Sequence, residues 1–264
     1  MERVLAEMSK LLLKGRLVNQ GLRFLDRVGA VVQLFPELHA LKGVPQDPEW
    51  HPEGDVWTHT TLVAQAASGL REEASHPRQL MWAALLHDLG KVGTTVQDPD
   101  GHIRSRGHED AGIVLARTML GRLKAPSALV EAVGLLVGRH LAPVHFEGAE
   151  GQPASDKAYR RLARALAQGG SDLDTLWRVA EADHLGRGQQ QRISPHGNAF
   201  RERCRALNVE KVPRPPAVLG RHLLARGFTP GPEIGQILRA CLHIQDSSGV
   251  EDPEAILDMA LSRK

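Results

Sequence analysis

The histidines of this chain stand where they could hold a metal ion. Thirteen histidines occur among 264 residues, and His87 is followed directly by Asp88 at the end of an apolar helical stretch that includes Leu85 and Leu86. An imidazole and a carboxylate in such a place are costly to bury unless something compensates their polarity. A divalent cation does so directly, so the pair predicts two metal ligands.

Four further residues complete the predicted ligand set. His59 shares a helix face with apolar residues, Asp183 continues an apolar helical stripe, and His108 and His140 stand at a predicted helix start and a predicted helix end. The set therefore has four imidazoles and two carboxylates: His59, His87, Asp88, His108, His140 and Asp183. Such ligands suit one or two divalent transition-metal ions (Mn, Co, Ni, Fe or Zn), and Mg is also compatible.

Taken one at a time, members of this set have simpler interpretations. A histidine on an apolar helix face, such as His59, is more often a hydrogen-bonded core residue than a ligand. Asp183 can pair with Arg187 four residues later on the same helix. His145 is a further candidate ligand, because Pro143 turns the chain back after the helix that carries His140.

Helices must bring these residues together, and the sequence predicts little else. Apolar residues recur at helical spacing, whereas the alternation typical of strands is nearly absent, so we expect an all-α fold with no strand. Asp55 is the expected N-cap of one helix, and Gly90 ends another. The predicted helical segments are about residues 2–35, 55–70, 77–90, 107–121, 127–140, 156–168, 172–183 and 198–207.

The order of these residues resembles the HD superfamily of metal-dependent phosphohydrolases, whose signature is a histidine, a later His-Asp pair and a distal aspartate on helices. The similarity extends to the HD region of bacterial tRNA nucleotidyltransferases, the CCA-adding enzymes. It is carried by residues 43–60, His87–Lys91, Gly107–Glu109 and Glu181–Arg187, and the segment Pro230–Leu238 is similar to that family's C-terminal tail.

This resemblance sets expectations about domains. It implies an HD helical bundle with small helical extensions: an N-terminal segment at 1–35, an HD phosphohydrolase domain at 36–190 and a C-terminal tail at 191–264. The nucleotidyltransferase head of that family needs a Gly-Ser motif followed by two aspartates on a sheet. The D-x-D matches in this sequence fall in a turn (98–100) and at a helix start (172–174). We therefore expect an HD body that does not add nucleotides.

For phosphate hydrolysis, the resemblance implies that the six ligands form two groups. His59, His87, Asp88 and Asp183 would bind one ion, and either aspartate would bridge to a second ion at His108 and His140. Two ions about 3.5–4 Å apart activate a hydroxide for attack and clamp the phosphate oxygens. The predicted catalytic residues are Asp88 and Lys91, and the predicted substrate-binding residues are Lys91, Arg104, Arg106 and Arg139. For each of these arginines alone, a solvated surface position is the commoner role.

The substrate is less determined, because HD enzymes cleave both phosphomonoesters and phosphodiesters. In the tRNA enzymes the HD region is associated with 2′,3′-cyclic phosphodiesterase and phosphatase activity. That resemblance favours 2′,3′-cyclic phosphates of nucleotides or RNA ends. A 5′-nucleotidase and a nucleoside triphosphohydrolase are the alternatives among enzymes. The alternative of another class is a tRNA-binding accessory body that works with a separate nucleotidyltransferase subunit.

Composition limits the environment more than the function. A net charge of +2 indicates nucleic acid only weakly, and the excess of arginine over lysine suits phosphate contact but also a GC-rich or thermophilic genome. Cys204 and Cys241 are far apart in the sequence, which excludes a disulfide framework. Glu2 and Glu7 fall where a signal peptide needs a basic and then an apolar run. We expect a cytoplasmic protein with no membrane span, and the sequence gives no indication of its oligomeric state.

Overall fold

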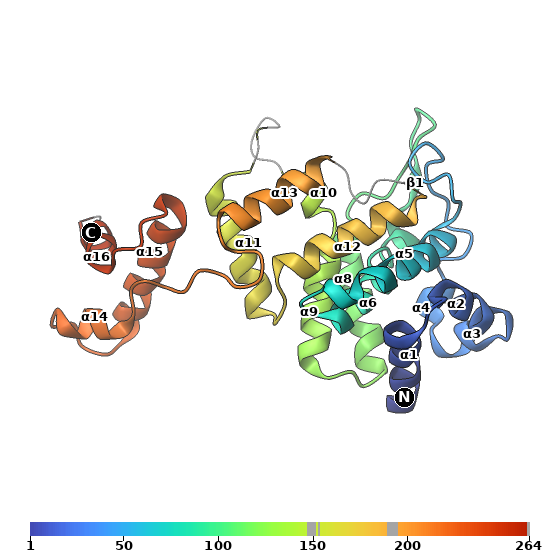
Figure 1. The fold of residues 1–264 in the computed structure, drawn as a ribbon, viewed down its shortest axis with the longest axis horizontal. Helices are drawn as coiled ribbons and strands as arrows, with labels where there is room; N and C mark the ends of the chain where they lie inside the picture. The colour runs from blue at the N-terminus through green and yellow to red at the C-terminus, as the bar shows by residue number, and fades with distance from the viewer. Residues whose placement is uncertain (147–151, 153, 189–194, 263–264) are drawn as a thin grey trace.

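The computed structural model describes residues 1–146, 152, 154–188 and 195–262 (Figure 1). Helices dominate this part of the chain, which confirms the all-α prediction. The longer helices are α1 (Glu2–Lys14), α2 (Val18–Arg27), α5 (Val56–Leu70), α6 (Pro77–Leu86), α8 (His108–Arg122), α9 (Ser127–Val137), α11 (Asp156–Gln168), α12 (Leu173–Gly186), α13 (Pro195–Ala206), α15 (Pro232–Ser248) and α16 (Pro253–Leu261). The short ones are α3 (Ala30–Leu34), α4 (Pro36–His39), the 3₁₀ turn η1 (Arg71–Glu73), α7 (Lys91–Thr94), α10 (Ala142–His145) and α14 (Gly220–Ala225).

One β-hairpin interrupts the helices, so the expectation of no strand was wrong at this point. Strands β1 (Val96–Gln97) and β2 (Ile103–Arg104) pair antiparallel. Each strand has two residues, which is too short for an alternating pattern to appear in the sequence. The Asp98–Gly101 turn between them was the visible signal, and the Gly101 amide donates to the Asp98 carbonyl at 2.9 Å.

Helices α5, α6, α9 and α12 form the centre of the bundle. Asp55 caps α5 as predicted, because its carboxylate accepts from the Thr58 amide at 2.9 Å. Helix α12 packs along α5, and α6 contacts α5, α9 and α12. A Cβ on Gly186 would lie 3.0 Å from the Val63 backbone nitrogen, so the absence of a side chain there allows α12 to approach α5 closely. The approach brings Asp183 on α12 near His59 on α5.

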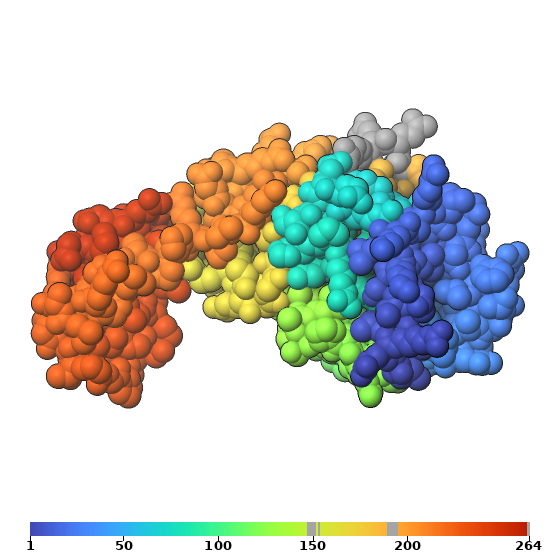
Figure 2. All heavy atoms as spheres, turned by 60° about the horizontal axis from the view of Figure 1, so that its bottom comes forward, coloured from blue at the N-terminus to red at the C-terminus, as the bar shows by residue number. Residues whose placement is uncertain are grey.

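The hydrophobic residues divide into two cores. The larger core extends from Leu5 in α1 to Val209, and the smaller one from Val218 to Ala260. Figures 1 and 2 show the smaller core as a lobe of α14, α15 and α16 beside the main body. The larger core ends at Val209 and the smaller core begins at Val218, so the structure separates the two cores at about residues 210–217. The domain boundaries at 35/36 and 190/191 stay predictions.

Helix α11 joins this lobe to the body through two arginines. Arg160 donates to the Asp246 carbonyl at 2.7 Å, and Arg164 donates to the Asp246 carboxylate at 2.8 Å. Asp246 lies in the last turn of α15, where cations are favoured by the exposed carbonyl groups of a helix end. The two arginines therefore hold the lobe by its longest helix.

One stretch of the described chain is long and apolar enough to cross a membrane. Ser127–His145 has a mean hydropathy of 1.3 in its most apolar window, and half of that window is buried inside the protein. Core helices of soluble proteins meet the same test, so a single such stretch is weak evidence of a span. Here α9 packs against α6 and α8 in the bundle.

Candidate metal centre

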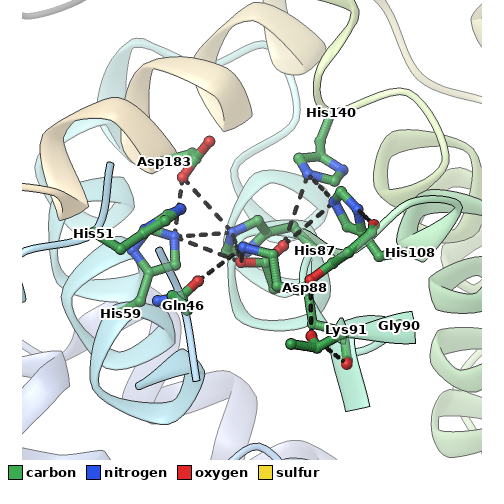
Figure 3. A network of polar contacts seen from close by, with 12 residues as sticks. Gln46, His51, His59, His87, Asp88, Gly90, Lys91, His108, His140 and Asp183 are labelled. Atoms are coloured by element: carbon green, nitrogen blue, oxygen red, sulfur yellow. Dashed lines mark hydrogen bonds and ion pairs between the residues drawn. The ribbon is translucent and has the colours of Figure 1, made fainter. Parts of the chain in front are cut away.

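The bundle brings together all six side chains that the sequence proposed as ligands (Figure 3). They come from three helices and two turns: His59 lies in α5, His108 is the first residue of α8, and Asp183 lies in the last turns of α12. His87 and Asp88 follow the end of α6, and His140 follows α9. All six are buried, and none is more than 8% exposed. Their convergence results from packing, because they span 125 positions of the sequence, from 59 to 183.

Four of these residues form one group, which we call site A: His59, His87, Asp88 and Asp183. His59 Nε2 lies 3.0 Å from Asp183 Oδ1 and 3.3 Å from His87 Nε2. His87 Nε2 lies 3.2 Å from Asp88 Oδ2 and 3.9 Å from Asp183 Oδ1. Two imidazole nitrogens and two carboxylate oxygens therefore face a common point.

Site B uses the other oxygen of the same aspartate. Asp88 Oδ1 lies 3.6 Å from His108 Nε2 and 4.0 Å from His140 Nε2, and these two nitrogens are 3.4 Å apart. Asp88 thus points one carboxylate oxygen at each pair of histidines. In contrast, Asp183 has its contacts at site A and with Arg187, at 2.7 Å.

The hydrogen bonds of the outer ring nitrogens, Nδ1, determine the tautomers of three of these histidines. Nδ1 of His87, His108 and His140 lies within 3.0 Å of a backbone carbonyl, respectively that of Ala84, Ser105 and Val137. A carbonyl only accepts, so each Nδ1 carries the proton and each Nε2 presents a lone pair to the centre. Hydrogen bonds of this kind commonly orient metal-binding histidines.

These residues fit divalent metal ions. Nitrogen and oxygen atoms bound to one ion at about 2.1 Å are about 3.0–3.4 Å apart in octahedral or tetrahedral geometry. Four of the separations at the two sites lie between 3.0 and 3.4 Å, and the rest are wider. Lone pairs that face one another beside two buried carboxylates repel unless a cation lies between them. The donor set is that of Mn, Fe, Co, Ni or Zn, with Mg as a harder alternative.

Cations around the carboxylates keep them ionised. Burial raises the pKa of Asp88, but the neighbouring His87 and Lys91 outweigh it and hold that pKa well below its ordinary range. Burial is likewise outweighed at Asp183, where Arg187 and His59 hold the pKa low. At His140, burial and the neighbouring His87 lower the pKa to about 3. Site B therefore keeps a neutral imidazole at neutral pH.

Lys91 lies at the centre, as the sequence suggested. Its Nζ is 2.8 Å from Asp88 Oδ2 and donates to Gln46 Oε1 at 2.8 Å. The side chain is 11% exposed, so the ammonium is held between the two partners rather than in solvent. It is a cation beside the oxygen that Asp88 gives to site A.

The proposed arginines lie differently. Arg104 pairs with Asp98 and Asp100, and Arg106 pairs with Asp98, all within the β-hairpin. Arg139 is exposed beside His140. His145 is exposed and belongs to none of the ligand groups that the described residues form. His102 pairs with Asp47 at 2.8 Å.

Three residues near the centre were not assigned a role from the sequence. Gln46 contacts Lys91, and Glu53 Oε1 lies 2.6 Å from His59 Nδ1 and 2.9 Å from His51 Nδ1. All three lie in the loop before α5, where no periodicity indicates which side chains point inward. The only available signal was a histidine and a glutamate a few positions before the first ligand.

Many arginines outside the centre are paired with acidic residues of the same chain. Arg201 and Arg205 pair with Glu210, Arg203 with Asp156, Arg214 with Glu251, and Arg226 with Glu254 and Asp258. Together with the two arginines that bind Asp246, they form intramolecular contacts. They do not make up a free basic surface.

Comparisons with known proteins agree with this geometry. The HD domain family model matches residues 56–185. The chain is 31% identical over 254 residues to the multifunctional CCA protein of Halorhodospira halophila, covering 90% of this chain and 53% of that protein. It is 33% identical over 256 residues to the CC-adding tRNA nucleotidyltransferase of Thermus thermophilus, covering 96% and 54%. The A-adding tRNA nucleotidyltransferase of Deinococcus radiodurans is 30% identical over 244 residues, covering 89% and 52%. The chain thus spans about half the length of these relatives.

Proposed function

Residues 56–185 are an HD domain in a chain homologous to CCA-adding enzymes over about 90% of its length, and from this we propose a metal-dependent phosphohydrolase. The finer proposal is a phosphodiesterase or phosphatase acting on 2′,3′-cyclic phosphates of nucleotides or RNA ends. The observation that carries the proposal is Asp88, whose two oxygens face two separate pairs of histidines.

The residues present support two metal sites of unequal character. Site A offers four protein ligands, and site B offers three: His108, His140 and Asp88 Oδ1. A centre with three protein ligands leaves positions open for water and substrate, whereas four ligands fill a tetrahedral site. Bound divalent ions supply Lewis acidity and lower the pKa of water, the chemistry that phosphate-ester hydrolysis needs. We therefore assign substrate contact mainly to the side of site B.

Lys91 and Asp88 are the proposed catalytic residues of the chain itself. Asp88 holds both sites at a fixed separation and, as a buried carboxylate, orients a water molecule near them. Lys91 is placed to move from Asp88 Oδ2 to a phosphate oxygen as negative charge develops there. Arg139, exposed beside His140, is the best placed of the proposed substrate arginines. Arg104 and Arg106 would first have to leave Asp98.

A substrate panel tests the proposal directly. Purified protein is stripped of metal and reloaded with Mn, Co, Ni, Zn or Mg. It is then assayed on bis-p-nitrophenyl phosphate, 2′,3′-cyclic nucleotides, 5′-nucleotides and nucleoside triphosphates. We expect metal-dependent cleavage that is fastest with the 2′,3′-cyclic substrates. No cleavage with any metal would refute the enzyme, while a preference for 5′-nucleotides or triphosphates would refute only the finer proposal.

A tRNA-binding accessory role is the second candidate, favoured by the names of the relatives, which are tRNA nucleotidyltransferases. It predicts tRNA binding that survives His87→Ala and Asp88→Ala, measured by gel shift. The phosphohydrolase predicts loss of all activity in the same folded variants. Either function would take nucleotides or RNA as its partner, and both suit a cytoplasmic location.

A further inference from the structure

We propose that Glu53 is a positioning residue for site A, which fixes the His59 ring so that its Nε2 faces the metal. The inference rests on the proposed metal centre and adds a residue outside the ligand set. Glu53 lies six positions before His59, in the loop that precedes α5. Its carboxylate would act on the metal only through this histidine.

The contact is short and buried. Glu53 Oε1 lies 2.6 Å from His59 Nδ1, the Glu53 side chain is 7% exposed, and His59 is fully buried. The same oxygen lies 2.9 Å from His51 Nδ1, and the His51 ring packs edge-on against His59 with centroids 4.8 Å apart. Figure 3 shows His51 beside His59. One carboxylate oxygen and one ring thus fix the orientation of His59 from outside the site.

His59 needs this support because of where it lies. The other three histidines lie at helix ends and use backbone carbonyls to hold Nδ1. His59 lies inside α5, where the carbonyls of the preceding turn accept helix hydrogen bonds. A partner for its Nδ1 must therefore come from another segment, and the loop supplies the Glu53 carboxylate.

The chemistry of the contact suits this role. A carboxylate against the outer nitrogen of a ligand histidine orients the ring and makes the imidazole a more basic ligand. A metal ion between Glu53 and His59 Nδ1 would require about 3 Å or more between these atoms, so at 2.6 Å the two side chains are in direct contact as an ion pair.

The test isolates site A. In a His140→Gln background, which weakens site B, Co²⁺ affinity is measured from the visible absorption of the bound ion, with and without Glu53→Gln. We expect Glu53→Gln to lower the affinity by about 10–100-fold. Glu49→Gln, an exposed glutamate of the same loop, is the matched control and should leave the affinity unchanged. Equal affinity in the Glu53→Gln and Glu49→Gln variants would overturn the proposal.

A second measurement needs no variant at position 53. In the zinc-loaded wild-type protein, nitrogen-15 NMR should find the His59 proton on Nδ1 and the metal on Nε2. The reverse assignment would overturn the positioning role even if Glu53→Gln fails to fold. Failure of the proposed metal centre is distinguishable, because the wild-type protein would then bind neither Co²⁺ nor Zn²⁺, and failure of the phosphohydrolase shows in the substrate panel alone.

Discussion

Gly90 and His108 lie backbone against backbone, so that a Cβ on Gly90 would be 1.9 Å from the His108 carbonyl oxygen and 2.7 Å from the Gly112 amide nitrogen. Neither neighbour is a flexible side chain. The turn that carries His87 and Asp88 therefore rests directly on the first turn of α8.

We expect Gly90→Ala to separate these segments. The strain of overpacking should lower the free energy of unfolding by about 1–3 kcal/mol or more, measured by urea denaturation. His108 should move away from Asp88, and metal analysis should find one bound ion where the wild-type protein binds two. Gly93→Ala is the control, because a Cβ there would meet nothing within 4 Å. Equal stability of the two variants would contradict the packing argument.

Substitutions of Asp88 and of His108 should remove different numbers of bound metal ions. Asp88→Asn removes the charged ligand shared by both sites and should reduce metal content toward zero. His108→Gln should remove only the ion at site B. Stoichiometry from inductively coupled plasma analysis checks this, with Asp110→Asn, at an exposed position in the first turn of α8, as the control. Retention of one ion in Asp88→Asn would exclude a bridging role.

Lys91→Met should separate metal binding from catalysis. The ammonium lies 2.8 Å from Asp88 Oδ2, so its removal frees that oxygen, and divalent affinity should hold or rise. The rate constant kcat should fall about 10²–10³-fold, because a cation near the developing phosphate charge is lost. Metal titration and steady-state kinetics measure the two effects, with Lys157→Met as the control on α11. A variant with normal kcat would remove Lys91 from the mechanism.

The stability of the metal-free protein should fall in acid partly because of His140. Its folded pKa is about 3, below the value near 6.5 of the unfolded chain, so the unfolded state binds the proton first and stability drops as pH falls below 6.5. This one group should cost about 1 kcal/mol between pH 6.5 and 5.5. The raised pKa of His59 acts in the opposite direction and remains in a His140→Gln variant. Denaturation in EDTA should show a shallower acid loss for that variant, and parallel curves would contradict the prediction.

The lobe of α14, α15 and α16 should loosen when Asp246 is changed. Asp246→Ala leaves Arg164 without its carboxylate partner, and trypsin should then cut after the exposed Lys211 at least about fivefold faster. Mass spectrometry of the fragments gives the rate. Asp258→Ala, which breaks an exposed pair within the lobe, should leave the rate near that of the wild-type protein. Metal content should be unchanged in both variants.

Much of the helical framework is predictable from local sequence. The Asp55 cap and the span of α11 were expected at the residues where the structure has them, because capping and apolar periodicity are local properties. The predicted helical segment at 2–35 is made of three helices in the structure, with Gly15 between α1 and α2 and Gly29 just before α3. The helices are interrupted near these glycines, although the apolar pattern continues across them.

The candidate centre was less predictable at its edges. Residue type and helix position indicated the six proposed ligands, whose roles stay a prediction. Partners beyond them depend on which side chains a loop turns inward, and local spacing carries no such information for Gln46 and Glu53. Arg104 and Arg106 precede His108 in the sequence, yet acidic residues of the hairpin bind them in the structure.

Backbone support for three of the histidines has a consequence for how mutations act on this protein. The carbonyls of Ala84, Ser105 and Val137 are present whatever side chain occupies those positions. Substitutions there can be tolerated without turning a ligand ring. The orientation of His59 depends on the identity of the side chains at positions 51 and 53, so one nucleotide change at codon 53 can disturb it. Mutational robustness is thus distributed unevenly, with site A as the fragile half of the centre.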